Sequence, residues 1–180
     1  ILFDGRDYFH PASLPGMAQR TITIGSASKE FRMIGWRMGW VAAPENVTEA
    51  LAKTHIYNVV TAGAFAQQAL TEAFLPQAEN SFKESLKVWE ERRNVVNLQL
   101  KDYAMIPAAG GWSQILDVSP LGMSADKASE LLLKKGKVAV TPMTHWGQQN
   151  SSQFIRLVFS NESVERLSSL RERFFKCFGQ

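Results

Sequence analysis

The chain alternates between short stretches with strand-like patterning and longer stretches with helix-like patterning. Residues 20–24, "RTITI", alternate polar and apolar side chains, which predicts a strand. Residues 39–44, "GWVAAP", form a short apolar run that predicts a second, buried strand. Residues 45–57 and 61–74 are expected to be helices, and the second should bury one apolar face. That face carries Phe65, Ala66, Ala69, Leu70, Ala73 and Phe74.

A longer amphipathic segment at residues 79–103 predicts one long helix, which could act as a spine between two domains. Its apolar stripe consists of Phe82, Leu86, Trp89 and Val96. After residue 105 the expected order is strand, helix, strand, strand, helix, which favours an α/β or α+β chain. We expect Ser124 to cap the first of these helices and Gly136 to end it. Ser160 or Asn161 should cap the last helix.

The composition is that of a globular protein with a core of its own. Of the 180 residues, 45% are hydrophobic and 21% are charged with mixed sign. The net charge of +3 is too mild to demand nucleic acid as a partner. No apolar run reaches the roughly 18 to 20 residues that span a bilayer, and no signal peptide is visible. The single cysteine, Cys177, fits a reducing compartment, so we expect a cytoplasmic protein without a membrane partner.

The stretch "IGSASKEFRMIGWRMGW" concentrates the chemistry of the chain. Lys29 directly follows a turn of small hydroxyl residues that includes Ser26 and Ser28. Such a turn offers backbone N–H groups and hydroxyl groups to an anion. Arg37 adds a permanently charged fork that suits phosphate oxygens. A lysine beside a phosphate cradle indicates a Schiff base with an aldehyde cofactor that carries a phosphate.

This stretch resembles the lysine signature of the class I and II pyridoxal-phosphate aminotransferases, which have fold type I. The positions in register with that signature are Ser26, Ser28, Lys29, Gly35, Arg37 and Gly39. The resemblance implies that pyridoxal 5′-phosphate is the cofactor and that Lys29 is the catalytic residue that forms the Schiff base. It also implies that Ser26, Ser28 and Arg37 bind the cofactor together with Lys29.

Further stretches resemble the same family. "FDGRDYFHPASLPGMAQRTITIGSASK" is similar to the segment before the lysine in kynurenine and glutamine transaminases. "VAVTPMTHWG" and "FIRLVFS" resemble a region that implies two substrate-binding residues, with Arg156 on the α-carboxylate and Trp146 lining the pocket. The residues alone leave alternatives open, because Arg156 could pair with an internal acid or lie at a sheet edge. Trp146 could equally be a packing residue.

The resemblance implies an enzyme that transfers an amino group from an L-amino acid to a 2-oxo acid. Aromatic, sulfur-containing or glutamine-like substrates and a homodimer are implied as well. The implied fold is α/β. Residues 1–75 would complete a large cofactor-binding domain with a mostly parallel sheet, and residues 76–180 would form a connecting helix and a small α+β C-terminal domain. We expect no metal site, because His10 and His55 lack companions at ligand spacing.

The similarity covers only the C-terminal half of the family, and the chain opens with "ILFDG" without an initiator Met. We therefore expect an incomplete C-terminal fragment that is inactive alone, with the family's cofactor-binding Asp and Tyr further upstream. Two alternatives stay open. One is a carbon–sulfur lyase or related fold-type I enzyme, and the other is a non-catalytic domain derived from a transaminase. The intact Lys29, Arg37 and Arg156 argue against the second.

Overall fold

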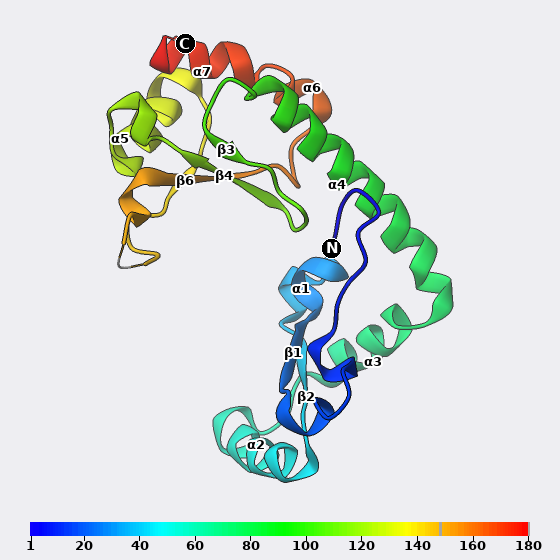
Figure 1. Cartoon of the computed structure of the whole chain (residues 1–180). Coiled ribbons are helices and arrows are strands. Elements are labelled where there is room, and N and C mark those ends of the chain that lie inside the picture. Colours follow the sequence, from blue (N-terminus) through cyan, green and yellow to red (C-terminus); the bar gives the residue numbers. More distant parts are fainter. Residues whose placement is uncertain (148, 180) are drawn as a thin grey trace. The chain divides into compact units, whose positions relative to one another are not determined.

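The computed structural model describes residues 1–147 and 149–179, which group into two compact units (Figure 1). We call residues 7–84 the N-terminal unit. The C-terminal unit combines Ile1–Arg6 with Ser85–Gln180. The expected division into domains between residues 75 and 76 stays a prediction.

The N-terminal unit pairs two short strands and carries three helices. Its strands are β1 (Thr23–Ser26) and β2 (Gly39–Ala42), and its helices are α1 (Ala27–Glu30), α2 (Glu45–Val59) and α3 (Ala64–Ala73). Single 3₁₀ turns lie at Pro11–Ser13, Ala18–Arg20, Ile34–Trp36 and Pro76–Ala78. The two expected strands and both expected helices are therefore present. The first strand begins later than predicted, because the 3₁₀ turn occupies the chain up to Arg20.

The two strands of this unit pair antiparallel, with Ser26 opposite Gly39. The mostly parallel sheet was expected of the large domain that these residues would complete, and within residues 7–84 the described ladder consists of this pair alone. The second strand was also expected to be buried, and that is wrong: Val41 is 45% exposed. No other described strand lies beside β2, so β1 covers only one of its edges.

A small core holds the N-terminal unit together. It consists of Ala27, Met33, Met38, Ala66 and Leu70. Around it, the Trp40 ring makes an edge contact with the Phe74 ring at a centroid separation of 5.2 Å. Helix α3 buries only two side chains, Ala66 and Leu70, which lie one turn apart. The wider face predicted from the sequence is wrong at both ends, since Phe65 is 90% and Phe74 is 56% exposed.

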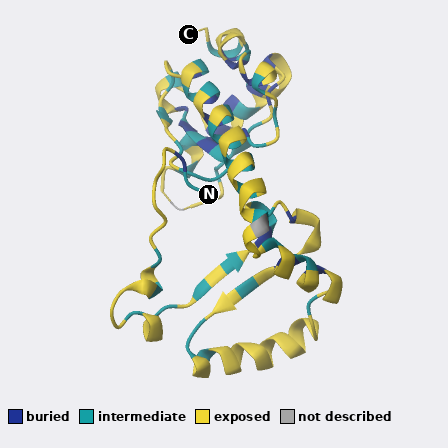
Figure 2. Ribbon diagram, turned by 90° about the vertical axis from the view of Figure 1, so that its right-hand side faces the viewer, coloured by how far each residue is buried: buried dark blue, intermediate teal, exposed yellow. Residues whose placement is uncertain are grey.

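Helix α2 buries no residue among those that the structure describes (Figure 2). Its apolar side chains stay in contact with solvent, and Tyr57 is 91% exposed. The segment is helical nevertheless, as its sequence predicted, because Glu45 follows Pro44 at its start and no glycine or proline interrupts it.

The C-terminal unit packs helices against a four-stranded sheet. Its strands are β3 (Met105–Ile106), β4 (Ser113–Asp117), β5 (Thr141–Pro142) and β6 (Phe154–Val158). Its helices are α5 (Ala125–Leu131), with a π turn at Leu132–Gly136, α6 (Val164–Leu167) and α7 (Leu170–Phe178), and it contains most of α4 (Glu79–Gln99). Further 3₁₀ turns lie at Ser119–Leu121 and Ser151–Gln153. The strand order is β3-β4-β6-β5, with every pair antiparallel.

The sheet has one dry face and one open face. On β6, Ile155 and Leu157 are buried in the core, whereas Arg156 between them lies on the other face. On β4, Leu116 lies on the dry face and Ile115, opposite Arg156, lies on the open face. Helices α4, α5 and α7 contribute further buried side chains, among them Val96, Ala125, Ala128, Leu170 and Phe174.

Serine hydroxyls cap the starts of two helices in this unit. The Ser124 hydroxyl accepts from the Lys127 amide at 3.4 Å, so this predicted cap is confirmed. The cap of the last helical region is Ser163, whose hydroxyl accepts from the Arg166 amide. The prediction of Ser160 or Asn161 was wrong, because the chain makes a further turn after β6 before α6 begins.

The helical segment ends at Gly136, as predicted, but the reason for a glycine at this position is close packing. The left-handed residue after the helix is Lys137, with φ 56°, and Gly136 is the last residue of the π turn. A Cβ atom on Gly136 would lie 2.9 Å from the Cys177 Sγ atom and 3.2 Å from the Arg173 carbonyl oxygen. A glycine is therefore required here so that the π turn can approach α7 closely.

A buried arginine fastens the first residues of the chain to α4. Arg93 is 4% exposed, and its Nη2 atom lies 2.5 Å from the Asp4 Oδ1 atom. Its Nη1 atom donates to the Ala108 carbonyl oxygen at 3.2 Å, and the guanidinium lies over the Phe3 ring at 4.9 Å. The sequence analysis had singled out none of these residues.

Candidate functional site

The turn from β1 into α1 is ordered by its own serines. Ser26 ends β1 in an extended conformation and begins α1. Its hydroxyl oxygen accepts a hydrogen bond from the Ser28 amide at 3.2 Å. Ala27, fully buried beneath the turn, fixes it to the core of the N-terminal unit. Lys29 is the third residue of α1 and is half-buried.

Arg37 reaches back to this turn from the chain just before β2. Its Nη1 atom donates to the Ser28 hydroxyl at 3.3 Å and to the Ile34 carbonyl oxygen at 3.0 Å. Its backbone is left-handed, with φ 54° and ψ 44°, which costs a residue other than glycine about 1 kcal/mol. The structure thus brings Ser26, Ser28 and Arg37 together as one group, which we call the hydroxyl–arginine cluster.

The cluster has the donors and the charge that a phosphate group needs. The Ser26 and Ser28 hydroxyls accept the bonds just described, so each keeps a hydrogen to donate. Arg37 has five N–H donors, and no carboxylate within residues 1–147 or 149–179 pairs with it. These residues therefore fit the phosphate of a cofactor, and Lys29 in the same helical turn supplies a candidate amine.

Two glycines let β1 and β2 pass closely beside the cluster. A Cβ atom on Gly25 would collide with the Trp40 indole ring at 2.0 Å, and one on Gly39 would lie 2.8 Å from the Gly25 carbonyl oxygen. The indole ring thus lies against the bare backbone of Gly25. Gly35, by contrast, faces open space.

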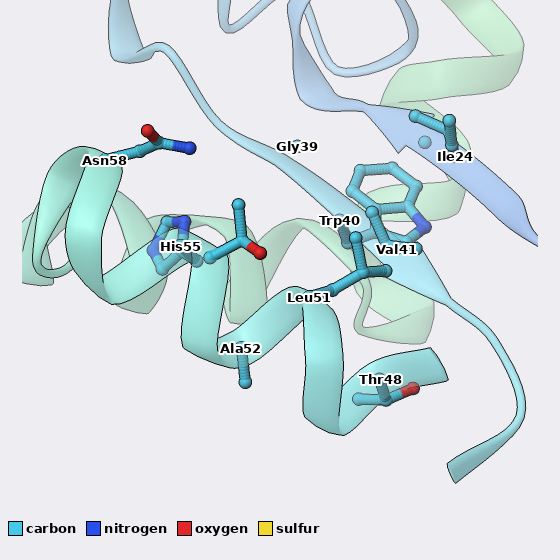
Figure 3. A pocket seen from close by; sticks show the side chains of 11 residues that line it. Ile24, Gly39, Trp40, Val41, Thr48, Leu51, Ala52, His55 and Asn58 are labelled. Atoms are coloured by element: carbon cyan, nitrogen blue, oxygen red, sulfur yellow. The ribbon is translucent and has the colours of Figure 1, made fainter. Parts of the chain in front are cut away.

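A hollow of about 540 Å³ lies between the strand pair and α2 (Figure 3). Trp40, Val41 and Leu51 line it with apolar surface, and His55 and Asn58 supply polar groups. None of the residues in the hydroxyl–arginine cluster lines it. The hollow is therefore a feature separate from the predicted cofactor site.

Arg156 lies in the C-terminal unit, on the open face of the sheet. Ile115 of β4 and Thr141 of β5 flank it in register. Its Nε atom is buried and has no hydrogen-bond partner among the described residues. No carboxylate in the described ranges forms an ion pair with its guanidinium. The internal acidic partner that the sequence left open is thus not found in the part described.

Trp146 is brought to Arg156 by the loop between β5 and β6. The centre of the Arg156 guanidinium lies 4.7 Å from the centroid of the indole ring. Trp146 is 55% exposed, so it lies at the surface and not in the core, and its role in substrate binding stays a prediction. The two substrate-binding candidates of the sequence analysis are therefore neighbours, although they are ten positions apart in the chain.

Sequence reasoning missed the residues that fix this loop. The Asp126 carboxylate accepts from the Thr144 hydroxyl, and the Ser151 hydroxyl lies within hydrogen-bond distance of two loop carbonyl oxygens. No spacing rule connects Asp126 in α5 with a loop 18 residues later. Only the packing of α5 beside β5 brings them together.

The described residues hold neither a metal-binding cluster nor a membrane-spanning helix. Within the described ranges, no three His, Cys, Asp or Glu side chains lie close enough together to hold a metal ion. None of the described helices combines the length and the apolar character needed to cross a bilayer.

Comparison with known proteins decides the family. The family "Aminotransferase class I and II" matches residues 5–174. The chain belongs to this aminotransferase family. The resemblance that the lysine signature carried is therefore confirmed, and the match runs over both units.

Relatives of known structure and sequence agree with this aminotransferase assignment. Aromatic-amino-acid aminotransferase 2 of Thermococcus litoralis is 32% identical over 98% of this chain and 46% of its own length. Kynurenine–oxoglutarate transaminase of Dictyostelium discoideum is 33% identical over 72% of this chain and 31% of its own length. The crystal structure of an aromatic aminotransferase from Pyrococcus horikoshii OT3 matches with a TM-score of 0.89 and 31% identity. That match covers 96% of this chain and 47% of the other.

The matches cover only part of each relative. The chain spans about half the length of the curated relatives that it matches, and it aligns with their C-terminal part. The expected mixture of helix and sheet is confirmed by the structure and its neighbours. The class I and II aminotransferases are pyridoxal-phosphate enzymes, which confirms the cofactor inferred from the signature.

Proposed function

We propose that the whole protein uses pyridoxal 5′-phosphate to transfer an amino group from an L-amino acid to a 2-oxo acid. The observation that carries this proposal is the hydroxyl–arginine cluster beside Lys29. It is a positively charged group of donors without a described carboxylate partner, in a chain of the aminotransferase family. The intact hydroxyl–arginine cluster does not support the alternative of a non-catalytic domain.

The N-terminal unit would hold the cofactor. Ser26 and Ser28 would donate their hydroxyl hydrogens to the phosphate, and Arg37 would add its charged fork. Lys29 would attach the cofactor through its Nζ atom and move a proton at the substrate α-carbon. When bound, pyridoxal phosphate supplies the electron sink that stabilises negative charge at that carbon.

The C-terminal unit would hold the substrate. The Arg156 Nε atom is buried and has no described partner, which leaves a polar group unsatisfied at a free-energy cost. A substrate α-carboxylate would satisfy the planar guanidinium through two parallel hydrogen bonds. Holding the carboxylate at this point would fix the orientation of the bonds at the α-carbon.

Trp146 supports aromatic, sulfur-containing or glutamine-like substrates. Its indole ring offers exposed apolar surface directly beside Arg156. An aromatic ring gains contact area against such a surface, whereas a second carboxylate on the substrate gains nothing from it. Two relatives are named for an aromatic amino acid and for kynurenine, which supports this preference, whereas an equally similar relative from Pyrococcus abyssi is named for aspartate. We include a homodimer in the proposal, which the exposed apolar residues of α2 support.

The test of this proposal is Lys29→Ala in the full-length protein. We expect the wild type to bind pyridoxal phosphate with a visible absorption band and to form glutamate from 2-oxoglutarate and an aromatic amino acid. Lys29→Ala should lose the band and reduce the rate at least about 1,000-fold, because the covalent and proton-moving group is removed. Lys53→Ala, an exposed lysine of α2, is the matched control and should retain both.

The products separate the transferase from the lyase alternative. Amino transfer requires a 2-oxo acid and releases no ammonia, whereas a carbon–sulfur lyase releases pyruvate and ammonia without a 2-oxo acid. A wild-type protein without the absorption band would contradict the proposed function. Ammonia release that is independent of 2-oxo acid would establish the lyase instead.

A further inference from the structure

The loop that carries Trp146 is closed by backbone hydrogen bonds at its base. The Met143 amide donates to the Phe154 carbonyl oxygen at 3.0 Å, which extends the pairing of β5 with β6. The Trp146 amide donates to the Met143 carbonyl oxygen at 2.9 Å and turns the chain. Trp146 therefore sits at a fixed turn next to β6, the strand that carries Arg156.

Two side chains outside the turn fasten it further. The Thr144 hydroxyl donates to the Asp126 Oδ2 atom at 2.5 Å, and Asp126 lies at the start of α5. The Ser151 hydroxyl lies 2.9 Å from the Thr144 carbonyl oxygen and 3.1 Å from the Gly147 carbonyl oxygen, between which it shares its one hydrogen. The Thr144 hydroxyl thus connects the loop to α5, and the Ser151 hydroxyl connects it to the 3₁₀ turn that precedes β6.

The indole ring and a carboxylate approach a guanidinium in different ways. The Arg156 guanidinium carbon lies over the indole ring, 4.7 Å from its centroid. A carboxylate binds a guanidinium in its plane, through the edge N–H groups. The ring and a carboxylate therefore use different parts of Arg156 and do not compete. The Nε atom, buried and without a described partner, lies on one of those edges.

We propose that Trp146 is a positioning residue, which holds the Arg156 guanidinium ready for a carboxylate, and that Ser151 and Asp126 keep Trp146 in that place. The inference rests on the proposed function, because it takes the substrate carboxylate to be the ligand of Arg156. It adds a role for three side chains that touch neither the cofactor nor the reacting atoms.

The physical reason is the flexibility of arginine. A free arginine side chain samples many rotamers, and fixing one of them reduces the affinity for a ligand. Indole is the best ring for a cation, so the stack orders the guanidinium before the carboxylate arrives. Losing a stack of this kind corresponds to a loss of about tenfold in affinity for the carboxylate, and phenylalanine should restore most of it.

The experiment measures binding of a carboxylate that does not react. In the full-length holoenzyme, calorimetry compares 3-phenylpropanoate with 3-phenylpropanamide, which lacks the negative charge. Trp146→Leu should weaken binding of the acid about tenfold more than binding of the amide, because both ligands lose the same contact with the ring. Trp146→Phe should stay within about threefold of the wild type for the acid. Phe175→Leu, an aromatic residue of similar exposure in α7, is the matched control and should change neither.

A second pair of variants tests the tether without touching the ring. Ser151→Ala should weaken binding of the acid about threefold, since the loop keeps its backbone hydrogen bonds but loses the hydroxyl bridge. Ser152→Ala is the matched control, because the neighbouring Ser152 is exposed and makes none of the hydrogen bonds found for described residues. It should leave the affinity unchanged.

The outcomes separate this inference from the proposed function. Equal losses for acid and amide in Trp146→Leu would overturn the inference, because the ring would then act by touching the ligand. An unchanged acid affinity in Trp146→Leu would overturn it as well, even if the wild type shows the cofactor band and prefers the acid. A wild type without the band overturns the proposed function instead. A wild type with the band but no preference for the acid over the amide removes Arg156 as the carboxylate site and overturns the inference.

Discussion

The two units of the chain use the same kinds of residue with very different degrees of burial. In the C-terminal unit, a single core extends from Phe3 to Phe174 and encloses the dry face of a four-stranded sheet. In the N-terminal unit, the buried cluster of described residues is small and only Trp40 of the strand β2 packs against it. Figure 2 shows α2 of that unit in the colour of exposed residues along nearly its whole length.

The C-terminal unit is stabilised by its own core, whereas the N-terminal unit exposes many of its apolar side chains. Apolar side chains such as Ile24, Tyr57 and Phe65 are more than three-quarters exposed in the N-terminal unit. Exposed apolar area of this extent is typical of interaction surfaces. The cofactor candidates lie in the unit with the weaker core, and the carboxylate candidate lies in the unit with the stronger one.

Truncation of a core residue in each unit would show the contrast most strongly. Phe159→Ala in the C-terminal unit should lower the free energy of unfolding by about 3–5 kcal/mol, because a fully buried ring leaves a cavity. Met33→Ala in the N-terminal unit should cost only about 1–2 kcal/mol, because the thin core around it can collapse. Amide hydrogen exchange on peptides from each unit measures both effects separately.

The exchange data also contain the internal control. Phe159→Ala should leave the peptides of α2 unchanged, because α2 lies outside the unit whose core contains Phe159. Equal losses from the two truncations would contradict the idea that the units differ in the quality of their cores.

A smaller effect is expected from adding a single methyl group. Gly136→Ala should destabilise the C-terminal unit by about 1–3 kcal/mol, because the new Cβ atom meets the Cys177 Sγ atom and the backbone of α7. Gly35→Ala in the N-terminal unit meets open space and should change the stability by less than about 0.5 kcal/mol. Urea unfolding measures both, and a tolerated Gly136→Ala would show that α7 is less tightly packed than described.

The smallest effect concerns the ion pair between Asp4 and Arg93 and its dependence on pH. The Arg93 guanidinium beside Asp4 holds the pKa of that carboxyl below its ordinary value of 3.8. A lowered pKa in the folded state means that the unfolded state binds the proton more readily. The stabilisation is therefore complete above the ordinary value, and it is lost as the pH falls from there through the lowered pKa.

Asp4→Asn should reproduce that loss at neutral pH. We expect a fall of a few degrees in the unfolding midpoint of the C-terminal unit, limited because Asp4 is half-exposed to solvent. Below the lowered pKa the variant and the wild type should converge, which calorimetry at several pH values would show. Asp7→Asn, an exposed acid without a described ion pair, is the control and should not lower the midpoint.

Local patterning predicted the elements but not how they are buried. The helical repeat of residues 45–57 predicted α2 almost to its ends, and strand patterns predicted β4 and β6. The same patterns failed for Phe65, which lies on the predicted apolar face of α3 yet is exposed. Periodicity reports which side chains share a face, whereas burial depends on what packs against that face.

The candidate site divides in the same way. The spacing from Ser26 to Arg37 was sufficient to propose a phosphate cradle, because a strand end, a turn and a short return bring such residues together locally. The tether from Asp126 and Ser151 to the loop of Trp146 was beyond prediction. It depends on α5 and β6 meeting the loop in space, and no local pattern encodes that meeting.

The sequence by itself determined the order of helices and strands, the lysine turn with its arginine, and the family to which the chain belongs. These follow from interactions between residues that are close along the chain. Only the tertiary structure decided that Gly136 serves close packing against α7, that Arg93 is buried on Asp4, and that an indole ring lies over Arg156. Each of these contacts joins distant segments, and such contacts form only where the packing of the whole unit lowers the free energy enough to offset the entropy of ordering them.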